Sequence, residues 1–323
     1  MTTVETVRGP VAADELKTVL MHEHVFVLDE EMHRNYPELW DEELVVAEAV
    51  RKLNGLAALG VSTIVDPTVI GLGRDVARVA RVNAQADINI VVATGLYTLG
   101  DVPLLFRYQG PGTLLGGEEP MVAMFVKDLT EGIAGTGIRA AFLKCAIEES
   151  LTPGVERVMR AVARAHLLTG APIIIHTSAA HQTGLVAQDV FRSEGVDPGA
   201  LVLAHSGDTD DLDYVRTLID RGSYVGMDRF GLDPYLPAGQ RVANVARLAG
   251  EGLASRLMLS HDYSCHIDWF PPGAREQIAP NWNFSCIHEQ VLPALRLAGV
   301  SEQQITTMLT DNPRRFLTAS HLS

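Results

Sequence analysis

Short apolar runs rich in β-branched residues recur along the whole chain, separated by longer stretches in which apolar positions follow helical spacing. Apolar runs of about four to eight residues indicate buried strands, and apolar positions three and four residues apart indicate amphipathic helices. Eight runs have the character of strands, at residues 18–21, 62–65, 88–93, 140–146, 173–176, 201–204, 224–227 and 257–260. Five of the stretches between them predict helices, at residues 42–59, 73–82, 120–133, 154–168 and 209–220.

Residues that favour helix ends support this alternation. Thr152 is followed by Pro153 just before the helix predicted at 154–168, a pattern typical of an N-cap with proline in the first turn. Gly60, Gly170 and Gly222 fall where predicted helices end, shortly before the next strand.

Strands that alternate with helices in one series predict parallel βαβ units, which belong to the α/β class. A doubly wound sheet and a closed barrel both fit eight such units. No glycine-rich nucleotide fingerprint opens a strand-to-helix turn, which removes the main support for a doubly wound nucleotide-binding fold. A repeat of about 35–40 residues favours a (β/α)8 TIM barrel, which we predict as a single domain over residues 1–323. Long loops are expected after strands three and eight, at residues 100–117 and 264–283, on the face that carries barrel active sites.

The net charge limits the classes of binding partner, and the cysteine content indicates the redox compartment. The chain has 26 Lys and Arg against 40 Asp and Glu, a net charge of −14, which opposes binding to nucleic acid or anionic lipid. The 3 cysteines show no CxxC spacing, which suits a reducing compartment. We see no secretory signal and no apolar stretch long enough to span a membrane, and we expect a cytoplasmic protein with a small-molecule substrate.

Imidazole, amine and carboxylate groups stand at the carboxyl ends of five predicted strands. Because positions i and i+2 of a strand face the same side, His22 and His24 can both point into the barrel mouth. Burying such groups without partners costs several kcal/mol. A divalent metal is a suitable partner for the whole set, which comprises His22, His24, Lys144, His176, His205 and Asp262.

Histidine alone is weak evidence, because a single histidine is usually a satisfied core or loop residue. The polar residues at the five strand ends are stronger evidence, because they recur at the spacing of the predicted β/α units. The other histidines lack that registration, and we expect surface or supporting positions for them, with His261 facing away from its neighbour Asp262: His33, His166, His181, His261, His266, His288 and His321.

Lys144 is the unusual member of the set, because a protonated amine beside two dications would be repelled. One interpretation is a buried ion pair, with Glu148 as the nearest acidic candidate. The other is a neutral amine that has captured CO2, giving a carbamate whose two oxygens can bridge two metal ions.

Seven segments together resemble the phosphotriesterase-like lactonases of the amidohydrolase superfamily, and NPRRF at 312–316 extends the resemblance to the C-terminal region. They are HEHVF at 22–26, PTVIGLGRD at 67–75, FLKC at 142–145, IIIHT at 173–177, LAHSGD at 203–208, GMDRFG at 226–231 and LSHDYSCHIDW at 259–269. The resemblance implies a centre of two divalent ions (Zn, Co, Mn or Fe), carbamylated Lys144 as an N6-carboxylysine, and a homodimer. His22, His24 and Asp262 would hold the more buried ion, and His176 and His205 the more exposed one.

By the same resemblance, a hydroxide bridging the two ions would attack the substrate, and Asp262 would accept the proton. Tyr97 would hydrogen-bond near this water and the lactone ring oxygen, and Arg229 would position the surrounding loop. The alternative for Tyr97 is an ordinary buried tyrosine. For Arg229 the alternative is an ion pair with Asp228 or Asp233.

Apolar residues in the loops after strands two, seven and eight favour a substrate with a polar head and an apolar tail. We expect substrate contacts from Leu72, Tyr97, Arg229, Phe230, Ile267, Trp269 and Trp282, with Leu232, Tyr235 and Phe270 in the same loops. Together with the resemblance, which implies a lactonase, these loops lead us to expect a metal-dependent enzyme that hydrolyses N-acyl-homoserine lactones, with promiscuous phosphotriesterase activity. Hydrolysis chiefly of aliphatic γ- or δ-lactones or of organophosphate triesters is the nearest alternative. A catalytically silent binding protein on the same barrel is an alternative of another class.

Overall fold

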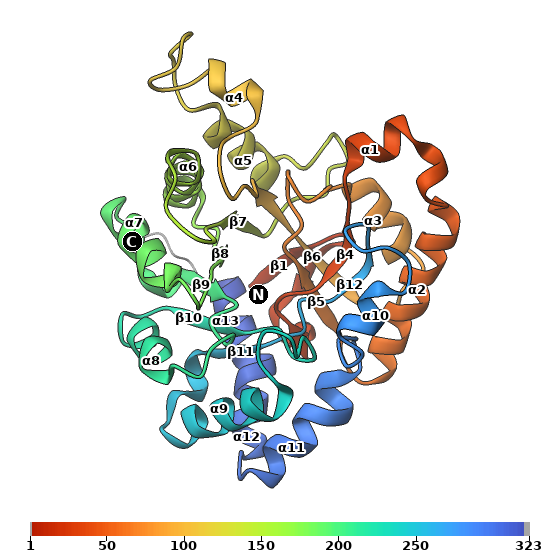
Figure 1. Cartoon of the computed structure of the whole chain (residues 1–323). Coiled ribbons are helices and arrows are strands. Elements are labelled where there is room, and N and C mark those ends of the chain that lie inside the picture. Colours follow the sequence, from red (N-terminus) through yellow and green to blue (C-terminus); the bar gives the residue numbers. More distant parts are fainter. Residues whose placement is uncertain (1, 320–323) are drawn as a thin grey trace.

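Eight parallel strands form one sheet in a computed structural model that describes residues 2–319 (Figure 1). The strands neighbour one another in chain order: β3 (Val19–Leu20), β5 (Thr63–Asp66), β6 (Asn89–Gly95), β7 (Phe142–Ala146), β8 (Ile173–His176), β9 (Leu201–Ala204), β10 (Tyr224–Met227) and β11 (Leu257–Leu259). Every pair in this sheet is parallel. The prediction of a (β/α)8 TIM barrel is confirmed.

The first and last strands of the sheet meet through contacts just beyond their ends. The His22 amide donates to Ser260 Oγ at 2.8 Å, and the Asp262 amide donates to the His22 carbonyl at 3.0 Å. Beyond this point β4 (His24–Val27) pairs in parallel with β12 (Ser264–Ile267). The nearly closed barrel is therefore joined directly at three of the residues predicted to carry the chemistry.

Helices surround the sheet on its outside, as Figure 1 shows. The larger ones are α2 (Glu42–Ala58), α3 (Val76–Asn83), α5 (Pro120–Thr130), α6 (Pro153–Thr169), α7 (Thr183–Ser193), α8 (Leu212–Asp220) and α9 (Ala238–Gly250). Thr152 caps α6 by accepting from the Val155 amide at 3.2 Å, as its place before Pro153 predicts. Gly60, Gly170 and Gly222 all have positive φ values, which explains why glycine stands at these helix ends.

The observed elements add detail to both predicted long loops and to the chain ends. The segment 100–117 contains α4 (Leu104–Tyr108), and 264–283 contains β12 and α10 (Ala274–Ile278), so neither is wholly irregular. Short elements that the apolar pattern did not predict include β1 (Thr3–Thr6), β2 (Gly9–Ala12), α1 (Glu30–Asn35), α11 (Leu292–Leu297), α12 (Glu302–Thr306) and α13 (Asn312–Thr318). Single turns complete the chain: η1 (Ala13–Leu16), η2 (Pro37–Leu39), η3 (Pro198–Ala200), η4 (Leu253–Arg256), η5 (Ile287–Val291) and η6 (Thr307–Asp311).

The alternation of side chains along each strand creates two apolar layers. On β8, Ile174 packs inside the barrel, whereas Ile173 and Ile175 pack outward beneath the helices. The interior layer also contains Phe316 of α13. The barrel interior is a packed apolar core without room for a binding site. The polar residues therefore lie at the carboxyl ends of the strands. Within residues 2–319, no helix combines the length and apolar character needed to cross a membrane.

Gly95 at the end of β6 shows how closely the strands approach beneath the predicted site. Its φ of +143° is one that other residues rarely adopt, and a Cβ at this position would overlap the carbonyl of Lys144 on β7. A side chain here would therefore both strain the backbone and push apart two strands of the barrel.

We predict that Gly95→Ala lowers the free energy of unfolding by about 1–3 kcal/mol, measured by urea denaturation. Gly239→Ala is the matched control, because Gly239 lies in α9 with open space around its Cα and no positive φ. The control should remain within about 1 kcal/mol of the wild type. Equal stability of the two variants would contradict the close approach at Gly95.

Candidate metal centre and active site

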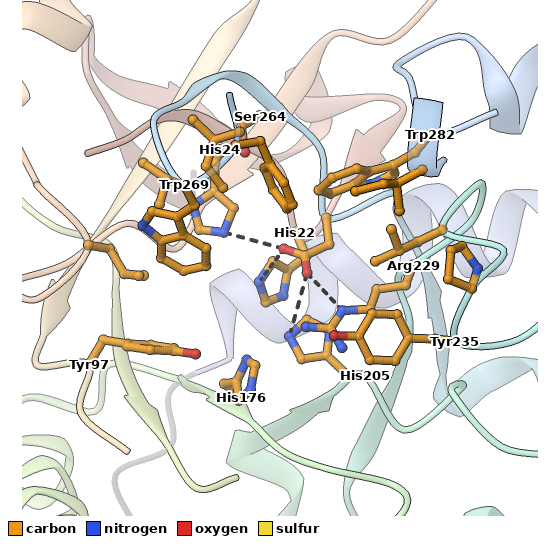
Figure 2. A pocket seen from close by; sticks show the side chains of 18 of the residues that line it. His22, His24, Tyr97, His176, His205, Arg229, Tyr235, Ser264, Trp269 and Trp282 are labelled. Atoms are coloured by element: carbon orange, nitrogen blue, oxygen red, sulfur yellow. Dashed lines mark hydrogen bonds and ion pairs between the residues drawn. The ribbon is translucent and has the colours of Figure 1, made fainter. Parts of the chain in front are cut away.

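A cavity of ≈ 320 Å³ opens at the carboxyl ends of the barrel strands (Figure 2). Its deep end is polar and its walls are largely apolar. All six predicted metal ligands line it, together with six of the seven predicted substrate-binding residues: His22, His24, Lys144, His176, His205, Asp262, Leu72, Tyr97, Arg229, Ile267, Trp269 and Trp282. Residues from nine separate segments of the chain thus meet in one cavity.

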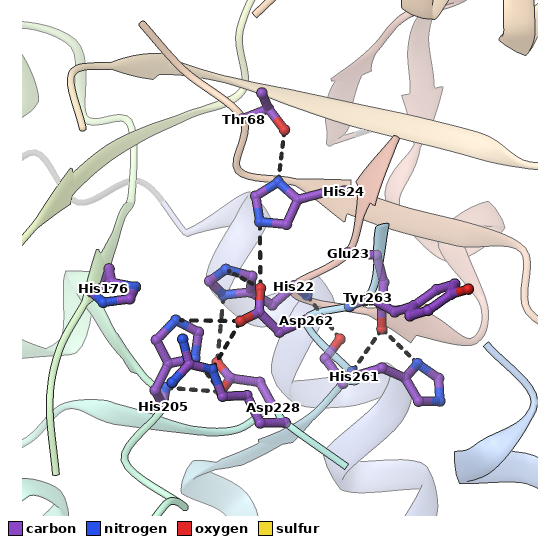
Figure 3. A network of polar contacts seen from close by, with 12 residues as sticks. His22, Glu23, His24, Thr68, His176, His205, Asp228, His261, Asp262 and Tyr263 are labelled. Atoms are coloured by element: carbon purple, nitrogen blue, oxygen red, sulfur yellow. Dashed lines mark hydrogen bonds and ion pairs between the residues drawn. The ribbon is translucent and has the colours of Figure 1, made fainter. Parts of the chain in front are cut away.

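The carboxylate of Asp262 lies at the centre of the polar end (Figure 3). Its Oδ1 is 3.5 Å from His22 Nε2 and 3.4 Å from His24 Nε2. Its Oδ2 is 3.8 Å from His205 Nε2. Donor atoms of His22, His205 and Asp262 all lie within 4.8 Å of one another, close enough to hold a metal ion together.

His176 extends this group toward Tyr97. Its ring centroid is 4.5 Å from that of His205 and 5.3 Å from that of Tyr97. Its Nε2 contacts the Glu148 carboxylate, which belongs to the loop after β7. The four imidazoles therefore form a continuous series across the cavity floor, from His24 to His176.

Two of the site residues have backbone conformations that are uncommon for residues other than glycine. His205 has a φ of +65° and Asp262 a φ of +55°. Asp228 stabilises the first by accepting from both the amide and Nδ1 of His205, at 2.8 and 3.0 Å. Because such conformations are costly and concentrate at functional sites, they support the assignment of these two strand ends to the active centre.

Carboxylates and a hydroxyl behind the histidines orient their rings. Asp228 Oδ2 faces His22 Nδ1 at 3.4 Å, in addition to its bonds with His205. Thr68 Oγ1 contacts His24 Nδ1 at 2.7 Å and is itself held by Asp66 at 2.5 Å. Such partners fix which ring nitrogen can bind a metal. No role was predicted for Asp66 or Thr68, although Asp66 ends β5 and Thr68 follows two residues later.

Glu23 and His261 form a separate buried pair behind the site. Glu23 Oε1 accepts from the amide and from Nδ1 of His261, at 2.8 and 2.7 Å, and Glu23 Oε2 accepts from the Tyr263 amide. His261 therefore faces away from Asp262, as predicted, and the pair holds the turn that presents Asp262.

Burial dominates the protonation of most of the histidines. It lowers the pKa of His22 to about 4 and also lowers the pKa of His176 and His205, so these rings are neutral and able to bind a metal. Burial opposes the charged form of His24 too, but bonds to Asp262 and Asp66 raise its pKa to about 9. A metal ion at His24 must therefore displace a proton.

Lys144 lies on β7 and points into this group with only 1% of its surface exposed. Its Nζ has no hydrogen-bond partner among the described residues. The interpretation of an ion pair with Glu148 is wrong, because Glu148 follows the strand end and contacts His176 instead. Burial lowers the pKa of Lys144 to about 8, against the opposing effect of nearby carboxylates.

Arg229 bridges two carboxylates at the edge of the site. Its Nε donates to Asp262 Oδ2 at 2.9 Å and its guanidinium donates to Asp208 Oδ2 at 2.8 Å. Buried Arg241 of α9 forms an ion pair with the other oxygen of Asp208 at 2.7 Å. The expected alternative partners are wrong, since Asp228 is engaged by histidines and Asp233 by Asn281. The roles of Asp208 and Arg241 were missed by the sequence analysis.

Tyr97 faces His176 across the cavity, beyond the end of β6. Its amide donates to the Ile70 carbonyl at 2.8 Å, which ties the strand end to the neighbouring loop. Burial, together with the negative charges of Glu148 and Asp262, raises the pKa of Tyr97, so its hydroxyl keeps its proton and can donate a hydrogen bond.

The predicted substrate contact of Phe230 is wrong. Phe230 is 1% exposed, packs in the core and does not line the cavity. Its neighbours Leu232, Pro234 and Tyr235 line the cavity in its place. Side chains in the loop after β10 thus alternate between core and cavity, a distinction that composition alone does not make.

Some of the remaining histidines lie at the surface, as predicted, and others are buried. His33 and His166 are 7% and 1% exposed, and His166 Nδ1 contacts the Ala171 carbonyl at the end of α6, remote from the cavity lining. His181 is exposed, and His266 and His288 are half-buried. His321 lies outside the described residues.

The donor set fits divalent metal ions. Four imidazoles and one carboxylate converge, three of the rings are neutral, and the unpartnered amine of Lys144 is buried among them. Nitrogen and oxygen donors of these kinds bind zinc and other first-row metals.

The chain matches the model of the phosphotriesterase family over residues 2–317. A phosphotriesterase homology protein of Mycobacterium tuberculosis is 52% identical over 318 residues, which are 98% of each chain. An aryldialkylphosphatase of Saccharolobus solfataricus is 38% identical over 312 residues, 96% of this chain and 97% of that one. The solved structure of the phosphotriesterase from M. tuberculosis superposes with a TM-score of 0.96 at 52% identity, covering 98% of both chains. The chain therefore belongs to the phosphotriesterase family of hydrolases.

Proposed function

We propose that the protein hydrolyses the lactone ring of N-acyl-homoserine lactones at a centre of two divalent metal ions, and so degrades quorum signals. The observation that carries the proposal is the division of the cavity into a polar end and apolar walls. His22, His24, His176, His205 and Asp262 form the polar end, and the walls include Leu72, Ile267, Trp269, Phe270, Ile278 and Trp282. An ester ring joined to an acyl chain matches both parts.

His22, His24 and Asp262 would hold one ion, and His176 and His205 the other. Lys144 would bridge them as a carbamate: its neutral amine attacks CO2, a C–N bond forms and one proton leaves to solvent. The lowered pKa and the missing partner of Lys144 support this modification. When bound, the ions (Zn, Co, Mn or Fe) would polarise the scissile carbonyl and lower the pKa of water.

The residues around the centre would then orient the substrate and move the proton. Asp262 accepts the proton of the attacking water, and Arg229 holds its carboxylate at 2.9 Å. Tyr97 donates a hydrogen bond to the ring oxygen as the alkoxide leaves. Asp228 and Thr68 keep the histidine rings in place during these steps.

Hydrolysis of phosphotriesters is the second candidate activity. The name aryldialkylphosphatase, carried by the relative at 38% identity, supports it. A phosphoryl oxygen can occupy the place of the carbonyl oxygen, so we expect this activity as the weaker one. Aliphatic γ- and δ-lactones would lack the chain that the apolar walls accommodate. From the resemblance to lactonases we also propose that the protein is a homodimer. We propose a cytoplasmic location, with which the three buried free cysteines are compatible.

Substrate comparison tests this proposal directly. We expect kcat/KM for acyl-homoserine lactones to exceed that for simple γ-lactones and for paraoxon, because only the first fill both parts of the cavity. Rates should be measured side by side on metal-loaded enzyme. A higher kcat/KM for paraoxon than for every lactone would reassign the protein to phosphotriesters, and binding without turnover of any of them would favour a binding protein.

Lys144→Ala should reduce the metal content from about two ions per chain and lower turnover by at least 100-fold, because one bridging ligand is lost. Short-chain carboxylic acids should restore part of both, since a carboxylate can take the place of the carbamate. Elemental analysis and kinetics give the two readouts. Lys127→Ala on α5 is the control. Full metal content and activity in Lys144→Ala would remove Lys144 from the centre.

Tyr97→Phe should reduce kcat for lactones by about 10- to 100-fold, because the departing alkoxide loses a hydrogen bond. Paraoxon turnover should fall less, since its nitrophenolate leaving group needs no such donor. Parallel steady-state measurements on both substrates provide the ratio. Equal losses on the two substrates would contradict the assigned role of Tyr97.

A further inference from the structure

The last residue of β12 and the three residues after it separate the substrate cavity from a second cavity. Ile267, Trp269 and Phe270 line both of them. The substrate cavity has a volume of ≈ 320 Å³, and the second, between this segment and the helices α1 and α2, has ≈ 790 Å³. We call residues 267–270 the cavity wall. Because the wall lines both cavities, a shift of the wall toward the second cavity would enlarge the substrate cavity.

Asp268 attaches this wall to the start of α1. Its Oδ2 accepts from the Asp29 amide at 2.7 Å and contacts His33 Nε2 at 3.0 Å. The Asp268 amide donates to the Val27 carbonyl at 3.2 Å. Asp29 is the N-cap residue of α1, so one carboxylate connects the wall to the first turn of that helix.

His33 is a rigid partner for Asp268. Its side chain is 6% exposed. Its ring lies against Trp40 with centroids 4.5 Å apart, and Trp40 lies 5.9 Å from His266 on the other side. On the cavity side of the wall, by contrast, Trp269 is 59% exposed. The contact between Asp268 and His33 is therefore a buried attachment beside an exposed part of the wall.

We propose that the pair of Asp268 and His33 determines the acyl-chain length that the enzyme accepts, by holding the wall forward into the substrate cavity. The inference rests on the proposed lactonase function. When the pair is lost, the wall can recede into the second cavity, and the enlarged substrate cavity accommodates more of a long chain. Neither residue contacts the predicted metal ligands, so the chemical step is unaffected. Both are positioning residues.

The test is a series of acyl-homoserine lactones of increasing chain length with the variants Asp268→Ala and His33→Phe. In the wild type, KM should fall by about fourfold per added methylene until the wall is reached, and then level off. In both variants the levelling should move to chains at least two carbons longer. For the shortest chain kcat should stay within twofold of the wild type. The double variant should shift no further than the single ones, because the residues act as one unit.

Glu276→Ala is the matched control, since Glu276 lines the second cavity and its one ion pair within residues 2–319 is with Arg275, at 3.7 Å. It should leave the chain-length profile unchanged. An unchanged profile in both Asp268→Ala and His33→Phe, or an equal loss of kcat at every length, would overturn the proposal. His33→Phe retains the stacking on Trp40. It therefore tests the same contact if Asp268→Ala melts at a much lower temperature than the wild type.

The outcome can be distinguished from failure of the proposed function. If the wild type hydrolyses no acyl lactone, the same variants are assayed with dialkyl nitrophenyl phosphates of increasing alkyl length. A shift of KM toward longer alkyl groups in this series would support the role of the pair although the lactonase assignment had failed. If the variants show the same profile as the wild type in this series as well, the role of the pair is overturned together with the lactonase assignment.

Discussion

The carboxylate of Asp262 lies where the ends of three strands meet, and burial alone would make its charge unfavourable. Three histidines and Arg229 surround it, and together they hold its pKa well below the usual range despite that burial. The dependence is mutual, because this carboxylate lies between the rings of His22, His24 and His205. The Asp262 amide also joins the two ends of the sheet by donating to the His22 carbonyl. Asp262 thus contributes both to barrel closure and to the polar end of the cavity.

A second group of buried residues holds the histidines and Asp262 in these positions. Asp228, Asp66, Thr68 and Glu23 are buried and each bonds to a histidine or to the turn beside one. Because a buried carboxylate is tolerated only where donors satisfy it, these residues and the histidines require each other. The positive φ values of His205 and Asp262 persist for the same reason: the surrounding bonds offset the cost of the backbone conformation. These bonds fix the orientation of the side chains at the polar end.

The sequence predicted the barrel and the polar end because both follow from periodic features. A buried strand has a short apolar run, and its carboxyl end is marked by the first polar residue after that run, as at His176 and His205. Side-chain partners across the barrel have no such signal, so Glu148 was one candidate partner for Lys144 although it contacts His176. Phe230 was placed in the cavity for a similar reason: a loop lacks a fixed period, and its apolar residues turn inward or outward according to contacts that only the fold supplies.

The residues proposed to carry the reaction and those proposed to select the substrate therefore lie on different kinds of structure, strand ends and loops. Groups at the polar end are carried by strand ends, whose positions are fixed by the ladder of backbone hydrogen bonds. The apolar walls are carried by loops, and the segment 267–270 is anchored to the rest of the protein chiefly through a single carboxylate and the parallel pairing of β12 with β4. Substitutions in such a loop can change the volume available to a substrate tail without disturbing Asp262. A barrel built in this way can acquire a new substrate while its reaction stays the same.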